Sequence, residues 1–369
     1  MSRPLSLAQI AREHEGPLVV PLMGFPGIKI NHSSLKQNEF NWGVQFWTLF
    51  ELSRRFQPDG LFIFMDLSVE ANALGLPVRF PLDESPSVEY PMVRTSHDLQ
   101  QFYMIDVLTD GRARVYIETM RLMARHLNTM RGGYVIGPYT LAGLMMGATN
   151  AAMATLDDPD LLHEALNLAT LVINRYAKAL AAAGADTIAI LEPSGVMLSP
   201  RQYREFSGNY TKQIIEQIDH ADVLPVLHIC GNTTHLMKEM VATGAQGLSL
   251  DSLVNFPEVA KSVPSDVVLI GNINPTAVMV DESPEGVYDT TRELVESMQP
   301  FPNFILSTGC DLPPETPLVN IQAFMEAGRG LPLGSMTPAD DTSDEALPVM
   351  DPTLSAIIRA AAERAFEPA

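Results

Sequence analysis

Short apolar runs rich in β-branched residues recur along the chain, separated by longer stretches with helical periodicity. This alternation is typical of parallel strands that are joined by crossover helices. There are eight such runs, the number that closes a barrel, and one barrel of this kind takes about 250 residues and tolerates insertions. We therefore predict an α/β fold, a (β/α)8 TIM barrel. The expected strands are Leu18–Met23, Leu61–Met65, Tyr134–Ile136, Thr187–Leu191, Val223–Leu227, Gly247–Leu250, Val267–Ile270 and Phe304–Leu306.

Helix signals fall between these runs. The stretch Asp157–Ala183 opens with Asp-Asp-Pro and is followed by a glycine, and Pro200–His220 follows a serine suited to the start of a helix. The segment 75–98 is rich in proline and acid without a clear period, so we expect an insertion near the barrel mouth there.

The end of the chain differs in composition from the rest. After Gly330 it becomes polar and acidic with several turn residues, and a helix is expected over Ser355–Phe366. We therefore assign residues 1–330 to the barrel domain and 331–369 to an acidic linker with a C-terminal helix.

Charge excludes some classes of partner. With 44 acidic and 24 basic residues the chain carries a net charge of -20, which repels a phosphate backbone. The amino end lacks a basic start followed by an apolar run, and no stretch approaches about 18 consecutive apolar residues. We expect a cytoplasmic protein with neither nucleic acid nor membrane as partner; the sequence leaves its oligomeric state open.

The residues that close the strands are the place to look for chemistry, because barrels of this class carry it at the carboxyl ends of their strands. Several of these residues are carboxylates or zinc-type ligands, and others are polar. Those that close or follow the strands are Asp66, Tyr139, Glu192, His228, Cys230, Asn232, Asp251, Asn272 and Cys310. We take Asp66, Tyr139, Asn232 and Asn272 as candidate substrate-binding residues and Glu192 as a candidate catalytic residue.

Both cysteines of the chain, Cys230 and Cys310, stand at strand ends. Zn²⁺ favours thiolate and imidazole, and a His-x-Cys pattern on a strand aims both side chains toward the same side. Taken singly, a cysteine is often a small buried hydrophobe and a histidine a satisfied polar residue. Together they predict a zinc site of His228, Cys230 and Cys310, with Asp251 as the fourth ligand.

At these residues the chain resembles a known family. The segment His228-Ile-Cys-Gly-Asn-Thr-Thr, continuing to Gly247-Leu-Ser-Leu-Asp251, closely resembles the methylcobalamin:coenzyme M methyltransferases of the uroporphyrinogen decarboxylase superfamily. The likeness extends through Gly137-Pro-Tyr-Thr-Leu-Ala-Gly and Ser307-Thr-Gly-Cys-Asp-Leu-Pro-Pro-Glu-Thr-Pro. The family's zinc ligands match here as His228, Cys230 and Cys310. Cobalamin-independent methionine synthase is similar in its ligand order, which supports Asp251.

The resemblance implies an enzyme that moves a methyl group between a corrinoid, methylcobalamin, and a small thiol such as coenzyme M. The cobalamin-binding signature Asp-x-His-x-x-Gly is absent from the chain, so the corrinoid is expected to arrive on a separate small corrinoid protein. His228, Cys230, Cys310 and Glu192 form the expected catalytic set.

Three alternatives stay open. The zinc could activate a methyl donor, such as a methylated thiol, amine or aryl methyl ether, for transfer to the corrinoid, or it could be purely structural. The chain could also be a uroporphyrinogen decarboxylase, since the glycine and proline signatures are shared. Decarboxylases of this fold carry arginines in the loop after the first strand, however, and here Gly24-Phe-Pro-Gly-Ile28 has none. A tetra-acidic substrate would also be repelled by the net charge.

Overall fold

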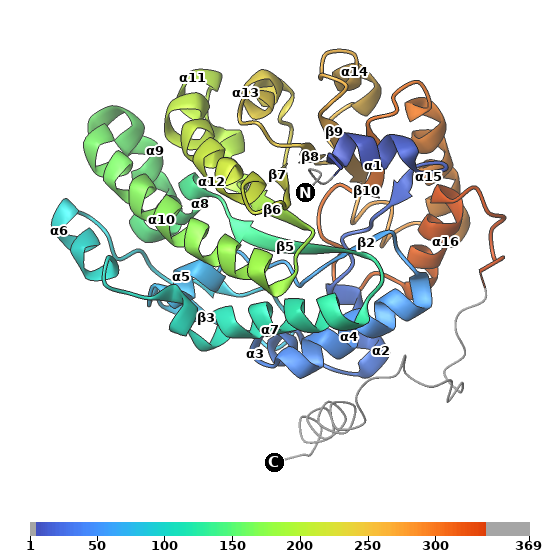
Figure 1. Ribbon diagram of the computed structural model, residues 1–369, viewed down its shortest axis with the longest axis horizontal. Coiled ribbons are helices and arrows are strands. Elements are labelled where there is room, and N and C mark those ends of the chain that lie inside the picture. Colours follow the sequence, from blue (N-terminus) through green and yellow to red (C-terminus); the bar gives the residue numbers. More distant parts are fainter. Residues whose placement is uncertain (1–4, 337–369) are drawn as a thin grey trace.

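A computed structural model describes residues 5–336 as a barrel of parallel strands surrounded by helices (Figure 1). Eight strands follow one another around the barrel in the order β1-β10-β9-β8-β7-β6-β5-β2. This confirms the predicted (β/α)8 architecture. The strands are β1 (Leu18–Val19), β2 (Gly60–Phe62), β5 (Met130–Ile136), β6 (Thr187–Leu191), β7 (Leu224–Ile229), β8 (Gly247–Leu250), β9 (Val268–Ile273) and β10 (Phe304–Thr308).

The barrel is nearly closed between β1 and β2, which are not paired as strands. One aspartate bridges this junction: the backbone N–H of Asp59 donates to the carbonyl oxygen of Val19 at 3.1 Å, and its carboxylate accepts from the N–H of Val19 at 2.7 Å. Both strands therefore keep their edge groups hydrogen-bonded at the junction.

The expected bounds of β6 and β8 agree with the structure, whereas β5 starts at Met130, four residues before its expected start. The added residues include Gly132 and Gly133, which pair with β2 and β6. Glycine carries no strand signal, so the sequence did not indicate them. A Cβ on Gly132 would come within 2.1 Å of the Phe62 ring, so the close packing of β2 on β5 requires a glycine there.

Helices form the outer ring. The predicted helix at 157–183 is observed as α10 (Pro159–Ala183), capped by Asp158, with α9 (Ala148–Asp157) ending just before it. The predicted helix at 200–220 is observed as α11 (Pro200–Tyr203) and α12 (Asn209–Asp219), joined by a π-helical turn. The other helices are α1 (Leu7–Glu13), α2 (Ile28–Asn31), α3 (Leu35–Phe40), α4 (Trp42–Phe56), α5 (Val69–Ala73), α6 (Ser96–Leu99), α7 (Gly111–His126), α8 (Pro138–Met146), α13 (Met237–Ala242), α14 (Phe256–Ala260), α15 (Pro284–Met298) and α16 (Leu318–Gly328).

The segment 75–98 forms a short antiparallel hairpin, β3 (Val78–Arg79) with β4 (Ser87–Val88), followed by the start of α6. The hairpin packs on α3, where the rings of Phe40 and Phe80 meet edge to face at 4.8 Å. The expected C-terminal helix at Ser355–Phe366 lies outside the described residues. Within residues 5–336 no helix is both long and apolar enough to span a membrane.

The barrel interior is filled by side chains. One end is plugged by α1, whose Leu7 reaches the strands and lines an internal cavity of about 20 Å³ together with Tyr134, His228 and Ser249. A cavity of this size has room for about one water molecule. A small-molecule ligand therefore reaches the strand ends only from the mouth at their carboxyl side.

Candidate metal centre

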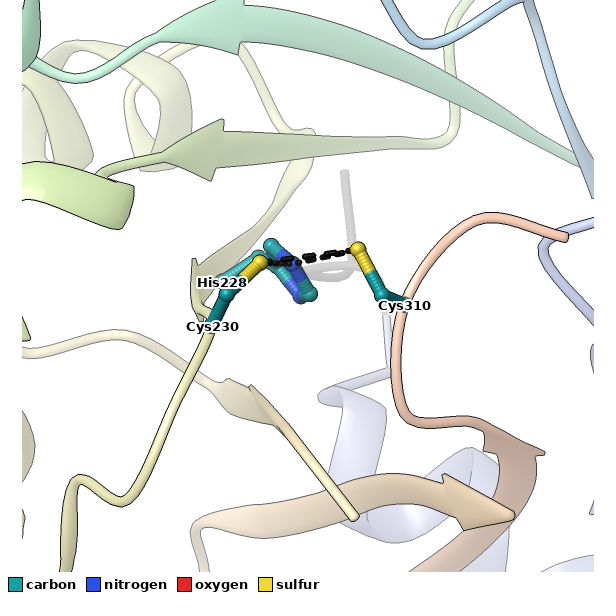
Figure 2. A group of neighbouring side chains, drawn as sticks. All are labelled: His228, Cys230 and Cys310. Atoms are coloured by element: carbon teal, nitrogen blue, oxygen red, sulfur yellow. Dashed lines mark hydrogen bonds between the residues drawn. The ribbon is translucent and has the colours of Figure 1, made fainter. Parts of the chain in front are cut away.

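Three side chains of types that can ligate a metal converge at the carboxyl ends of β7 and β10 (Figure 2). The Nε2 atom of His228 lies 3.1 Å from Sγ of Cys230 and 3.8 Å from Sγ of Cys310, and the two Sγ atoms are 3.5 Å apart. In the part of the chain that the structure describes, this is the group of three or more His, Cys, Asp or Glu residues whose ligand atoms lie within 4.8 Å of one another. The predicted set of His228, Cys230 and Cys310 is thus brought together.

The strands position these side chains with the help of two glycines. His228 lies within β7 and pairs in register with Ser249 of β8. Gly231, directly after Cys230, has a φ of 85°, a conformation that favours glycine. A Cβ on Gly309 would come within 2.6 Å of a backbone nitrogen, so Cys310 reaches the mouth only because a glycine precedes it.

The arrangement fits a zinc ion. A tetrahedral site with Zn–S near 2.3 Å and Zn–N near 2.0 Å places two sulfurs about 3.8 Å apart and a sulfur about 3.5 Å from a nitrogen. The observed separations of 3.1, 3.5 and 3.8 Å lie close to these values. The other ring nitrogen, Nδ1 of His228, is 2.9 Å from Oγ of Ser249, which is the kind of partner that orients a metal-bound imidazole.

The two thiols influence each other. The hydrogen bond from Cys310 lowers the pKa of Cys230 below that of an ordinary thiol. The same contact, followed by burial, raises the pKa of Cys310. The two thiol pKa values therefore shift in opposite directions, because the two sulfur atoms share one hydrogen bond.

Asp251 lies near the centre but is engaged elsewhere. One carboxylate oxygen accepts from the N–H of Gly231 at 2.8 Å, and the other accepts from the N–H of Leu253 at 3.0 Å and the hydroxyl of Ser252 at 3.2 Å. The structure does not bring the carboxylate of Asp251 into the group of ligand atoms. Its hydrogen bonds hold the turn that follows Cys230.

Glu192 is completely buried at the end of β6 and faces the N-terminus of α8. Its carboxylate accepts from the N–H groups of Tyr139 at 2.9 Å and Thr140 at 2.7 Å, from the hydroxyl of Thr140, and from that of Ser207 at 3.2 Å. Burial raises the pKa of Glu192 to about 7, although these hydrogen bonds oppose the rise. Every contact is with the protein, so the geometry gives Glu192 a positioning role for α8.

Asp66 is also buried and fully engaged. Its carboxylate forms an ion pair with Arg112 and accepts from the hydroxyl of Tyr116 at 2.9 Å and from the N–H and hydroxyl of Ser68, both at 2.7 Å. It has no lone pair directed at the mouth that a substrate could use without displacing one of these partners.

The other candidate substrate-binding residues differ in accessibility. Tyr139 is buried on α8, and burial, followed by the charge of Glu192, raises the pKa of its hydroxyl to about 12. Asn272 donates from its side chain to the carbonyl oxygens of Asp251 and Val254 at 2.9 and 2.7 Å, so it braces the loop after β8. Asn232 is exposed beside the centre and accepts from the N–H of Thr234.

Sequence reasoning missed three residues of the centre: Ser249, Tyr134 and Asp311. Ser249 stands two residues before Asp251, so strand alternation places it on the same face, and that spacing was the available signal. Asp311 directly follows Cys310 and Tyr134 lines the barrel beneath His228, but neither position is distinguished by spacing or composition.

Comparison with known proteins identifies the family. Residues 49–331, more than half of the chain, match the family model described as uroporphyrinogen decarboxylase (URO-D). The chain belongs to the URO-D family. One relative is the methylcobamide:CoM methyltransferase MtbA of Methanosarcina acetivorans, 28% identical over 270 residues that cover 72% of this chain and 77% of that protein. Another is the uroporphyrinogen decarboxylase of Alkalilimnicola ehrlichii, 29% identical over 285 residues that cover 74% of this chain and 77% of the relative.

Two solved structures support the fold. A methyltransferase from Methanosarcina mazei superposes with a TM-score of 0.80 at 21% identity, covering 89% of this chain and all but 1% of that one. A B12-independent methionine synthase from Shewanella has a TM-score of 0.54 at 14% identity, covering 78% of this chain and 86% of the other. The predicted resemblance to methylcobamide:CoM methyltransferases within the superfamily is confirmed.

Proposed function

We propose that this URO-D family member is a zinc-dependent, corrinoid-dependent methyltransferase that moves a methyl group between a corrinoid on a partner protein and a small thiol. The observation that carries the proposal is the convergence of His228, Cys230 and Cys310 at the open end of a packed barrel. Similarity to MtbA, whose name specifies methylcobamide and CoM, supports the choice of donor and acceptor.

The residues of the site suit a thiol better than water. A zinc ion held by His228, Cys230 and Cys310 would bind a substrate thiol as its thiolate at neutral pH. Two cysteine thiolates make such a centre electron-rich and a weak activator of water. Ser249 orients the imidazole, Asp251 fixes the turn after Cys230, and the filled interior keeps bulk water out from below.

The transfer balances without a further reactant. The sulfur lone pair of a substrate thiol would form the new bond to the methyl carbon, and the electron pair of the broken carbon–cobalt bond would stay with the corrinoid on the partner protein. The thiol proton leaves to solvent. In the reverse direction a methyl donor would charge the corrinoid: the bond between its methyl carbon and its sulfur, nitrogen or oxygen atom would break, and the leaving group would keep that electron pair and take up a proton.

Decarboxylation, the activity named in the other relatives, is less well supported. The loop after β1, Gly24–Ile28, is a buried helical turn without arginine, and Asp66 is paired with Arg112. Described residues at the mouth therefore offer no arginine loop to hold a polycarboxylate, and the net charge of -20 opposes its approach.

The proposal is tested by mixing the zinc-loaded protein with free methylcobalamin and a panel of thiols while cob(I)alamin is followed by absorbance. We expect thiol-dependent consumption of methylcobalamin that is lost with Cys310→Ala and kept with Asp289→Asn, a charge change on the exposed side of α15. A second panel of methylated thiols, amines and aryl ethers with cob(I)alamin tests the reverse direction. If no thiol consumes methylcobalamin and Cys310→Ala retains full zinc, the proposal is wrong.

A further inference from the structure

A cavity of about 640 Å³ lies at the end of the barrel opposite the candidate metal centre. Pro17, Asp59 and Phe304 line it, and these residues stand at the starts of β1, β2 and β10. The end of α1 and the helices α15 and α16 supply its other walls (Figure 1). Its volume is in the range of ligand-binding pockets. The described lining includes no residue of the candidate metal centre, so this cavity, which we call the basal groove, is a separate site.

The basal groove gathers basic side chains in a chain that is otherwise acidic. Its lining includes three arginines and a histidine against two acidic residues, namely Arg12, Arg292, Arg329, His14, Glu15 and Asp59. The carboxylate of Asp59 is already engaged, because it accepts from the N–H of Val19 at 2.7 Å. On a chain with a net charge of -20, the groove is therefore a local basic patch that attracts an anion.

The three guanidinium groups keep N–H donors that the described protein does not use. Arg12 donates to the carbonyl oxygen of Ser265, and Arg329 donates to carbonyl oxygens at the end of α4. Within residues 5–336, Arg292 alone of the three forms an ion pair, with the exposed carboxylate of Glu296 at 3.0 Å. A guanidinium carries more N–H groups than these bonds occupy, so each arginine has donors left for a carboxylate.

The acidic end of the chain starts at the rim of the basal groove. Met336, the last described residue, is held by α16: its N–H donates to Glu326 and its carbonyl oxygen accepts from Gln322, both at 2.7 Å. Its Sδ lies 3.9 Å from Nη1 of Arg329. Residues 340–345, Asp-Asp-Thr-Ser-Asp-Glu, carry four carboxylates and no basic group. An extended chain covers about 13 Å in four residues, so this acidic run begins within reach of Arg329.

The groove and the segment also match in their apolar parts. Val295, Met298 and Phe301 give the groove an apolar wall. In the sequence, the acidic run is followed directly by Ala-Leu-Pro-Val-Met at 346–350. A segment of this pattern can pair with the arginines and also cover the wall, whereas an inorganic anion can do only the first. The family match ends at residue 331, so the acidic run is a feature of this chain beyond the shared barrel.

We propose that residues 340–350 dock in the basal groove of the same molecule, with the carboxylates of residues 340–345 on Arg12, Arg292 and Arg329. An exposed ion pair is weak on its own, but the short connection through Met336 holds the segment at a high effective concentration beside the groove. The docked segment joins α1, which plugs this end of the barrel, to α15 and α16. It acts away from the candidate metal centre, so methyl transfer does not depend on it.

Zero-length cross-linking tests this contact in the full-length protein. Arg12→Lys and Arg292→Lys each put an amine where a guanidinium now lies, and a carbodiimide joins an amine only to a carboxylate that touches it. The control is Arg121→Lys on α7, an exposed arginine that is paired with Glu118 and does not line the groove. Mass spectrometry of proteolytic fragments locates each new amide bond. A denaturing gel separates links within one chain from links between two chains.

We expect both groove variants to form amide bonds to residues 340–345 within one chain, at a yield at least about tenfold above that of Arg121→Lys. Higher salt during the reaction should lower this yield, because salt screens exposed ion pairs. Equal yields in the groove and control variants would overturn the proposal. Links to these residues that form only between two chains would overturn it as well, because the occupant would then be a second copy.

Hydrogen exchange supplies a test that leaves the arginines in place. Neutralising the four carboxylates of residues 340–345 together, by Asn and Gln, should speed exchange of the backbone amides of α1. The matched control neutralises Asp351, Glu363 and Glu367, which lie beyond the proposed docking segment, and should leave that exchange unchanged. If both variants exchange in α1 at the wild-type rate, the docked segment does not hold α1 and the proposal is wrong.

Discussion

Two polar clusters at the carboxyl end of the barrel were predicted by the same argument and turn out to be opposites. The sulfur cluster, His228, Cys230 and Cys310, gathers ligand atoms whose main contacts are with one another. In the second cluster, called the Asp66 cluster, both carboxylate oxygens of one aspartate are paired with donors of the protein itself. Its members are Asp66, Arg112, Tyr116 and Ser68. Position at a strand end is shared, so it does not decide function; the unused bonding capacity of the ligand atoms does.

The Asp66 cluster holds several elements of the fold together. The Arg112 guanidinium lies 4.6 Å from the Phe80 ring centre and 5.4 Å from that of Phe40, so the same residue joins β2, α3, α7 and the β3–β4 hairpin. Burial, followed by the charge of Asp66, raises the pKa of nearby Glu39 to about 8. A buried ion pair beside a carboxyl group that burial keeps neutral is typical of a structural network.

The largest expected effect separates the two clusters most sharply. Cys310→Ala removes one of three zinc ligands, so we expect loss of stoichiometric zinc and a fall in methyl transfer of more than about a hundredfold, beyond what loss of a residue that only orients a ligand causes. Zinc is measured by mass spectrometry of the purified protein, and unfolding by denaturant. Because the barrel interior does not depend on this thiol, the free energy of unfolding of the metal-free protein should change little. Full zinc content in this variant would contradict the assignment.

Arg112→Met tests the opposite cluster. It leaves Asp66 buried without its cation, so we expect a loss of about 3–5 kcal/mol in the free energy of unfolding, with zinc content unchanged in the folded fraction. The matched control is Arg121→Met on the same helix, whose exposed pair with Glu118 should contribute less than about 1 kcal/mol. Equal effects of the two substitutions would show that the Asp66 pair is not structural.

Glu192 allows a further test, through the pH dependence of the free energy of unfolding. Burial raises its pKa in the folded protein to about 7, above the usual value of 4.5, so between these values the folded state binds the proton that the unfolded state has released. Stability from this group is therefore present at low pH and is lost as pH rises from about 4.5 to 7, by up to about 3 kcal/mol. Glu192→Gln cannot titrate. Relative to wild type it should gain stability between pH 5 and pH 8 in urea unfolding, and a pH-independent difference would refute the assignment.

The smallest expected effect concerns orientation within the sulfur cluster. Ser249→Ala removes the partner of His228 Nδ1, and we expect zinc affinity to fall about 10- to 100-fold with the fold intact. Competition with a chelator of known affinity measures the change. Affinity equal to wild type would mean that the imidazole is fixed by packing alone.

Much of the fold was predictable because apolar runs report buried strands directly: β6 and β8 agree residue by residue with expectation. The start of β5 was missed because Gly132 and Gly133 are required by close packing against Phe62, a tertiary cause that leaves no local pattern. The π-helical turn between α11 and α12 is likewise invisible to periodicity.

The site was predictable only in part. Two cysteines at strand ends beside a histidine are rare enough to mark a metal centre, and the structure brings all three together. Whether a carboxylate at a strand end is free or engaged depends on partners distant in sequence, such as Arg112 for Asp66 and Thr140 for Glu192. The hydrogen bonds of Asp251 to Gly231 and Leu253 are set by loop geometry in the same way, so its role as fourth ligand remains a prediction.

The central claim is that the sulfur cluster holds zinc with one position open to a thiol. Zinc K-edge X-ray absorption of the zinc-loaded protein measures the sulfur neighbours of the metal directly. We expect two sulfurs near 2.3 Å with two lighter atoms, and three sulfurs after addition of a saturating small thiol. A sulfur count that stays at two in excess thiol would contradict the account, because the centre would then be closed and structural.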